Sequence, residues 1–483
     1  MRDTSIFFSA RLLRWAEENE LAMKRYRLLA LVLAWSVVMT AKATAQTTSL
    51  SFDDALLLGM ERNPAIVASD YAEQAAHRER QAAIGLFMPQ ISIKGAYTHL
   101  NKDIKIDFNQ MVSSFSSVLG RDLTALGLDF AYPLQRRNTA FLGGDIAVPI
   151  FAGGKIWTAN KAAKVNEERT AEQSRQVRAT LTVEIVERYF GVALARQVVA
   201  IREEALRAVE QHSADVAQLE QQGLAVDSER FYVEYRMAEA VRDLQRARLQ
   251  LKTAQEALQS SLGAEFAITP STPMFLLAKI EPLDYFQALA KIQNPQLAEV
   301  DRLRELARLN LRLHYGNLFP EVVAMGGMIF CDHQLSPFVP RMAVGVGLNF
   351  KLFDGLNREY KVSAARLQLR RAEALERDAE QEILLLVEKL YNEVQSVLAT
   401  VSAVERSEQF AEEFLRAKRY AFLDGMATTT EVVDAALNLS RARLERVQAA
   451  YEFDVALARL LEASGAVDSF LQYLHSQAAQ SVF

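Results

Sequence analysis

The sequence predicts a mainly α-helical protein with four short β-strands, which complete a membrane β-barrel only together with other copies of the chain. Three observations predict this fold class. Short stretches alternate strictly between apolar and small or polar residues, long helical patterns run without an internal breaker, and the chain repeats itself in two halves.

The composition excludes several classes of protein. Of the 483 residues, 50% are apolar and 24% are charged, which is typical neither of a disordered chain nor of a polytopic helical membrane protein. The net charge of -5 argues against binding of nucleic acid. Cys331 is the only cysteine and the histidines are scattered, so we expect no disulfide and no metal site. Without a phosphate-binding loop, GxSxG or HExxH motif, we predict no enzyme activity and no cofactor.

The first apolar run has the features of a secretory signal peptide. "LLALVLAWSVVM" begins at Leu28, follows the basic stretch "MKRYR" and precedes "AKATAQ", whose small residues form an A-x-A cleavage pattern. The run is shorter than the ~20 residues of a membrane span. We therefore expect residues 1–45 to be a signal peptide, with Met23 as the physiological start and 1–22 a mis-assigned extension; the alternative is a buried core helix. No cysteine stands at the cleavage site, so no lipid anchor is predicted.

The chain then repeats itself. The motifs Asn63-Pro64 and Asn294-Pro295 are 231 residues apart, and each begins a helical pattern that ends before a proline. Downstream the offset becomes 202 and holds for three pairs: Phe151 with Phe353, Gly223 with Gly425, and Gly263 with Gly465. We therefore divide the mature chain into a first repeat (46–262), a linker (263–281), a second repeat (282–465) and a tail (466–483).

Each repeat is predicted to form a helix, a β-hairpin and a long helical hairpin. The first β-hairpin spans about 91–151, with strands at 91–100 and 144–151; the second spans about 322–353, with strands at 322–330 and 342–353. Each following helix, 156–222 or 357–423, contains about 66 residues and is roughly 100 Å long. The change of offset places a long polar loop at 101–140, which contains Phe108, Phe115, Phe130 and Tyr132. This loop either folds over the mouth of the barrel or is a plain surface loop.

Four two-faced strands leave open edges, and in lipid each unpaired backbone group costs several kcal/mol. Strands of ~9–11 residues with one apolar face are typical of a membrane barrel, and known bacterial barrels have at least eight strands. Several chains are therefore needed to close one barrel. The alternative is a pair of hairpins that cap a soluble helical bundle.

The Asn-Pro helices, the hairpins ending in "PIFAGG" and "KLFDGL", and the helical turns "QQGLAV" and "LDGMATTTEVVDA" resemble the TolC family of outer-membrane efflux proteins. The resemblance implies a homotrimer in the outer membrane of a Gram-negative bacterium, with a 12-stranded barrel continued by a 12-helix tunnel into the periplasm. It also implies a periplasmic adaptor and an inner-membrane pump as partners. The expected function is the exit duct of a tripartite efflux system for drugs or small molecules. Alternatives are an outlet for type I protein secretion or heavy-metal efflux and, in another class, a soluble periplasmic coiled-coil adaptor.

The resemblance places a periplasmic gate after the second glycine turn, where Glu431 and Asp434 match carboxylates that line the family's closed aperture. Spaced three apart, they share one helix face, and threefold symmetry would form a carboxylate ring that attracts cations and raises carboxylate pKa values. The alternative for Glu431 is a capping box with Thr428, and an Asp near a helix N-terminus also favours the helix dipole. Asp227 and Glu229 occupy the first-copy turn, where we expect one of them to be an ordinary cap. Phe422 replaces the family's usual gate tyrosine.

The two helical turns resemble the sites at which the family meets its adaptor. They comprise Gly223, Leu224 and Ala225 in the first copy and Gly425, Met426 and Ala427 in the second. A glycine that ends a long helix in the left-handed conformation is the structural alternative.

Overall fold

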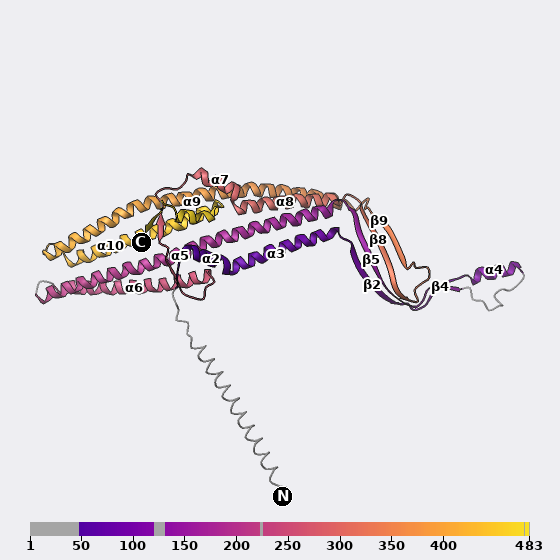
Figure 1. Ribbon diagram of the computed structural model, residues 1–483, viewed down its shortest axis with the longest axis horizontal. Helices are drawn as coiled ribbons and strands as arrows, with labels where there is room; N and C mark the ends of the chain where they lie inside the picture. Colours follow the sequence, from indigo (N-terminus) through magenta and orange to yellow (C-terminus); the bar gives the residue numbers. More distant parts are fainter. Residues whose placement is uncertain (1–47, 120–130, 223–225, 478, 483) are drawn as a thin grey trace, which may run out of the picture.

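The computed structural model describes residues 48–119, 131–222, 226–477 and 479–482. Helices form a long body, a β-sheet continues from one end of it, and a further hairpin projects beyond the sheet (Figure 1). The predicted signal peptide and the turn Gly223–Ala225 lie outside the described residues.

Two long helices run through the body. Helix α5 spans Lys155–Gln221 and helix α9 spans Asn357–Leu423, with 67 residues each, so each rod is about 100 Å long. These bounds agree with the predicted bounds to within one residue. Helices α6 (Asp227–Ser261) and α10 (Thr429–Ala463) follow them, have 35 residues each, and pack back along them as two helical hairpins.

Shorter helices precede each β-hairpin. In the first half these are α2 (Phe52–Arg62) and α3 (Pro64–Ile84), and in the second half α7 (Leu283–Gln293) and α8 (Pro295–Gly316). Their lengths match between the halves to within one residue, as the internal repeat predicts.

The Asn-Pro motifs have a double role. Asn63 caps α3 by accepting a hydrogen bond from the Ala65 amide at 2.8 Å, and its own amide group donates to the Ser261 carbonyl at the end of α6. Asn294 likewise caps α8 and donates to the carbonyl of Ala463 at the end of α10. Because both asparagines are buried, each satisfies two helix ends that lack partners, which explains why the motif recurs.

The sheet has the strand order β2-β5-β8-β9 and is antiparallel throughout. Its strands are β2 (Gln90–His99), β5 (Asn138–Ala152), β8 (Glu321–His333) and β9 (Met342–Asn349). The two predicted hairpins therefore join through β5 and β8 into one curved sheet (Figure 1).

Three predicted strand ends were wrong. Strand β8 ends at His333 rather than 330, because its last residues still pair with β5. Strand β5 begins at Asn138 rather than 144, because its first residues pair with the end of β2 and with His333. Strand β9 ends at Asn349 rather than 353, because its partner β8 begins at Glu321 and offers no residue to pair beyond that point. A register shift at Pro149, which lacks an amide proton, bends the inner strand β5.

The segment predicted as a long polar loop, 101–140, contains secondary structure that the sequence did not predict. Strand β3 (Ile104–Asp107) pairs with β4 (Ala131–Gln135) into a second hairpin, and helix α4 (Asn109–Leu119) lies at its far end. The hairpin projects beyond the sheet in Figure 1. A ring contact of 5.7 Å joins Tyr132 to Phe338 in the β8–β9 turn, so the base of the extension is anchored. Phe108 is exposed, Phe115 falls within α4, and Phe130 lies outside the described residues.

The linker and the tail also contain strands that the sequence did not predict. Strand β1 (Thr48–Leu50) pairs in parallel with β6 (Ile268–Pro270), and β7 (Met274–Leu276) pairs with β10 (Gln480–Val482). The tail adds a short 3-10 helix, η3 (Val467–Ser469), and helix α11 (Phe470–Leu474). Strands of three residues carry too little alternation to be recognised in a sequence.

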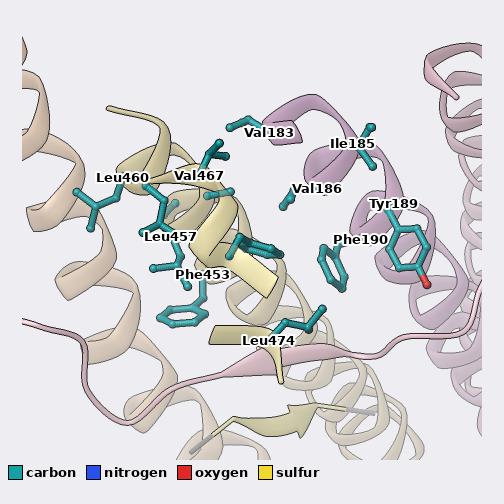
Figure 2. Close-up of a cluster of buried hydrophobic side chains, with 14 of the residues drawn as sticks. Val183, Ile185, Val186, Tyr189, Phe190, Phe453, Leu457, Leu460, Val467 and Leu474 are labelled. Carbon is teal, nitrogen blue, oxygen red and sulfur yellow. The ribbon is translucent and has the colours of Figure 1, made fainter. Parts of the chain in front are cut away.

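These segments close the largest hydrophobic core around the middle of α5 and α10 (Figure 2). Tyr189 of α5 is fully buried there and its hydroxyl has three main-chain partners. It donates to the Leu50 carbonyl at 2.7 Å and accepts from the amides of Ser271 and Thr272 at 3.0 and 2.9 Å. This one side chain therefore attaches the N-terminal strand and the linker to the long helix.

Candidate functional site

One face of the four-stranded sheet is apolar and exposed. On the two outer strands the side chains of this face are more than two thirds exposed, and they are Ile91, Ile93 and Tyr97 of β2 and Val344, Val346 and Leu348 of β9. In water, each would forgo the roughly 1.5–3 kcal/mol that a buried side chain of this size gains. A continuous apolar surface of this kind therefore requires an apolar surrounding.

The opposite face of the sheet is polar. It carries Ser92, Lys94 and Thr98 on β2, and Lys94 forms an ion pair of 2.8 Å with Asp145 of β5. The alternation with a period of two thus separates an apolar face of the sheet from a face that carries charged and polar side chains.

Both edges of this sheet are open within the described part of the chain. Strand β2 pairs only with β5, and strand β9 pairs only with β8. Each edge presents a row of unpaired amide and carbonyl groups next to the apolar face. Within the described ranges, none of the helices combines the length and apolar character needed to cross a membrane.

At the other end of the molecule, the turn between α9 and α10 is a Schellman motif. Gly425 has a φ of 72° and donates to the Phe422 carbonyl, while Met426 donates to the carbonyl of Ala421. The left-handed conformation explains the glycine structurally. No other group lies within 4 Å of the place where a Gly425 side chain would begin, and Met426 is exposed, so this turn presents a free surface in the described chain.

Glu431 forms the capping box that the sequence left open as an alternative. Its carboxylate accepts from the Thr428 amide at 2.9 Å, and the Thr428 hydroxyl accepts from the Glu431 amide. Lys418 of α9 also donates to this carboxylate, at 2.7 Å. The Lys418 hydrogen bond, followed by the Thr428 amide, lowers the pKa of Glu431 below its ordinary value. Within one chain the shift is therefore opposite to the rise that a carboxylate ring predicts.

Asp434 links the two helical hairpins. Its carboxylate accepts from the Tyr232 hydroxyl of α6 at 3.0 Å and from Arg236 at 3.3 Å. Arg236 also stacks on the Tyr232 ring and donates to Glu239, so three side chains of α6 hold the contact. Tyr232 lies 202 residues before Asp434, so corresponding positions of the two repeats bond to each other.

The first-copy carboxylates do not act as caps. Asp227 and Glu229 lie in the first turn of α6, but the N-cap position belongs to Val226, whose side chain cannot accept a hydrogen bond. The predicted ordinary cap was therefore wrong; Asp227 is exposed, Glu229 is half-buried, and both lie where a negative charge favours the helix dipole. Glu229 corresponds to Glu431 at the offset of 202, but without a capping threonine it does not form the box.

Phe422 packs against a buried histidine. The rings of Phe422 and His212 of α5 lie 4.7 Å apart, edge to face, which joins α9 to α5 near the tip. Burial lowers the pKa of His212; Asp215 on the same helix and the Thr429 main chain raise it, and Arg419 of α9 lowers it further. The sequence analysis missed Lys418, Tyr232, Arg236 and His212. For Tyr232 a signal existed, because the offset of 202 aligns it with Asp434.

Among the residues that the structure describes, no cluster of three or more His, Cys, Asp or Glu side chains could hold a metal ion. Cys331 is exposed on β8.

Comparison with known proteins finds outer-membrane efflux and secretion proteins. The model of the outer membrane efflux protein family matches residues 287–466. Alkaline protease secretion protein AprF of Pseudomonas aeruginosa is 25% identical over 324 residues, which cover 63% of this chain and 65% of AprF, just under two thirds of its length. Outer membrane efflux protein BepC of Brucella suis is 23% identical over 338 residues, covering 68% of this chain and 73% of BepC.

The fold is also that of a known membrane channel protein. A crystal structure of CusC, from a study of its folding and transmembrane channel formation, has a TM-score of 0.72 at 16% identity and covers 86% of this chain and 92% of CusC. In sequence and in fold the chain is therefore similar to outer-membrane efflux proteins, in agreement with its resemblance to the TolC family.

Proposed function

We propose that three copies of this chain form a passive exit duct in the outer membrane, which serves a tripartite efflux system together with a periplasmic adaptor and an inner-membrane pump. The observation that carries the proposal is the sheet with two open edges and an apolar outer face. Edge-to-edge pairing of β2 with β9 of the next copy satisfies both edges and turns every apolar face toward lipid.

The dimensions fit this arrangement. Strand β2 has 10 residues, the length needed to cross the apolar layer at a tilt of ~45°. Three sheets of four strands make a barrel of about twelve, within the range of known bacterial barrels. Helices α5 and α9 continue the wall for about 100 Å into the periplasm. The number of copies comes from the resemblance to the TolC family.

The tip of the helices is the proposed gate. The Asp434 link between α6 and α10 holds the two helical hairpins of one chain together, and releasing it would free α9 and α10 to move away from the channel axis. We propose Asp434 as the gating carboxylate and assign Glu431 mainly to the helix cap. Asp227 and Glu229 would add negative charge to the same aperture, and Phe422 would hold α9 against α5.

The adaptor is proposed to dock at the helical turns. The described turn, Gly425 to Ala427, contains the exposed side chain of Met426. An apolar side chain of this kind can be buried by a helical partner. Gly223, Leu224 and Ala225 are proposed to form the matching contact.

A second candidate function is the outlet of a type I protein-secretion system, because AprF is a protease secretion protein. Heavy-metal efflux stays a third possibility for the cargo. The adaptor-like alternative is disfavoured, because 86% of the chain matches the fold of a channel protein.

The duct is tested by cross-linking its sheets. In a Cys331→Ser background, one cysteine on the outer edge of β2 and one on β9 should yield a covalent, outer-membrane trimer after oxidation, while either single cysteine should not. A monomer in the soluble periplasmic fraction would refute the duct. To separate the cargoes, a deletion strain is tested for drug sensitivity and for loss of a secreted protease.

A further inference from the structure

A pocket of about 260 Å³ lies where the sheet meets the helices, far from the tip. It is bounded by the end of α8, the first residue of β8, the chain just after β9 and the first turns of α5 and α9. Asn349 and its partner Glu321 lie on the polar face of the sheet, since their neighbours Leu348 and Val322 belong to the apolar face. The pocket therefore opens toward the side that faces the interior of the duct.

The lining is rich in cations. Lys155, Lys351, Arg358 and Lys361 line the pocket together with only two carboxylates, Glu321 and Asp354. Each carboxylate has one cationic partner, Glu321 in Lys155 and Asp354, through Oδ2, in Arg358 at 3.1 Å; Oδ1 of Asp354 is buried without a hydrogen-bond partner among the described residues. Throughout the described parts of the chain, neither Lys351 nor Lys361 has an ion-pair partner. Two exposed ammonium groups therefore remain beside one pocket without a counter-charge.

Two further donors of the pocket are poorly satisfied. The Arg358 side chain is 13% exposed, yet its guanidinium reaches the carbonyls of Asn317 and Leu352 only at 3.4 and 3.5 Å. The Nδ1 atom of His314 is buried and has no hydrogen-bond partner. Buried donors without good acceptors are costly, and an oxyanion in the pocket would supply an acceptor to Arg358 and, when Nδ1 of His314 carries a proton, to His314.

The junction does not need these charges to fold. In the first repeat the corresponding positions of the same junction hold apolar residues: Ala83 for His314, Pro149 for Lys351, Ile156 for Arg358 and Ala159 for Lys361. Both halves nonetheless have a strand that leads into a helix of 67 residues. Arg358 contacts the Asn317 and Leu352 carbonyls and so helps to join sheet and helix, whereas Lys351 and Lys361 form no ion pair in the described chain and are not needed for that junction.

We propose that this pocket is an oxyanion-binding site, which takes a phosphate or carboxylate group on Lys351, Lys361 and Arg358. Three copies would set a basic ring at the base of the barrel, which would favour anionic cargo after its passage through the acidic tip. The role in cargo passage rests on the proposed duct, whereas the site itself is contained in one chain. A free anion in the duct and the phosphate of a lipid headgroup offer the same chemistry.

Binding is measured on the purified full chain in a phosphate-free maltoside detergent, which requires no channel activity. Inorganic phosphate is titrated and followed by ³¹P line broadening, and phosphatidylglycerol retention is followed by native mass spectrometry. The variant Lys351→Gln/Lys361→Gln should lose about tenfold or more in affinity, as expected for the loss of charge-assisted hydrogen bonds. The matched control, Lys279→Gln/Lys389→Gln, removes the same charge from exposed sites outside the pocket and should bind like the wild type.

The two sources of the anion give different results. Phosphate binding that is lost only in the pocket variant identifies a free oxyanion, and lipid retention lost only in that variant identifies a headgroup. If the pocket variant and the control bind both probes as the wild type does, or lose them equally, the proposal is wrong. Trimer migration of each variant on an unheated gel reports separately whether the proposed duct forms.

Discussion

Removing the Asp434 link should open the helical tip. In Asp434→Ala, the Tyr232 hydroxyl and the Arg236 guanidinium lose their shared acceptor on α10. The side chains of Asp434 and Arg236 are 47% and 28% exposed, so solvent screens the ion pair to about 0.2–1 kcal/mol. The hydrogen bond from Tyr232 adds about 0.5–1.5 kcal/mol. The link thus stabilises the closed arrangement by about 1–2 kcal/mol per chain.

In a trimer that opens in one step, three such links act together. Their loss amounts to about 3–6 kcal/mol, which shifts the closed-to-open equilibrium roughly 10²- to 10⁴-fold. The assay is single-channel conductance in planar bilayers, with Tyr232→Phe, Asp434→Ala and the double variant as a thermodynamic cycle. The double variant should open little more than Asp434→Ala alone, because both changes remove the same bond.

Glu431→Gln is the matched control for this experiment. It removes a carboxylate one turn earlier on α10, and glutamine can still close the capping box. If the link controls the gate, conductance rises in Asp434→Ala and stays near the wild type in Glu431→Gln. Equal increases in the two variants would favour a ring of carboxylates instead. Unchanged conductance and cation preference in Asp434→Ala would refute the gating role of this residue.

Four further predictions concern other parts of the chain. Tyr189→Phe removes three hydrogen bonds to the main chain and leaves the Thr272 amide without this acceptor, while the Ser271 amide still donates to the Leu50 carbonyl. The change should cost about 1–3 kcal/mol, seen as a lower thermal midpoint. Burial raises the pKa of Asp454 well above its ordinary range, with a smaller opposing effect of the Phe275 main chain. The free energy of unfolding therefore falls as pH rises above about 4. In Asp454→Asn, the thermal midpoint should change less with pH between pH 4 and 8 than in the wild type. Burial lowers the pKa of His212, so the neutral imidazole contributes to the stability of the fold, and this contribution is lost as pH falls below about 6.5. Protonation should then loosen the tip and raise conductance between pH 7 and 5, and His212→Phe should remove this rise. Met426→Glu should leave the trimer inserted but abolish drug resistance, and unchanged resistance would contradict adaptor docking at this turn.

The helices were predictable because their signals are long and local. Two stretches of 67 residues without proline, each followed by a glycine turn, leave few alternatives to a rod. The strand ends and the hairpin β3–β4 were not predictable, because they depend on which strand lies opposite. The partner strand was predicted to reach residue 100, but the stretch from Asn138 to Gly143 lacks a strict alternation of apolar and polar residues, so its pairing was not recognised. Likewise, the three-residue strands β6 and β7 are strands only because β1 and β10 lie beside them.

The candidate site shows how the two repeats divide structure from function. Where both copies need the same backbone geometry, the residue is the same, as at Asn63 and Asn294, which join the same two helix ends in each half. Where the two copies have different residues at corresponding positions, those residues form a contact between the copies or add a charge to one of them. Tyr232 and Asp434 occupy corresponding positions, and the Tyr232 hydroxyl of α6 donates a hydrogen bond to the Asp434 carboxylate of α10. Two identical residues could not supply both this donor and this anionic acceptor. Lys351 stands where the first copy has Pro149, so only the second half can carry a cationic pocket. Positions that differ between repeats on a shared scaffold are therefore the first places to look for gating and selectivity in this chain.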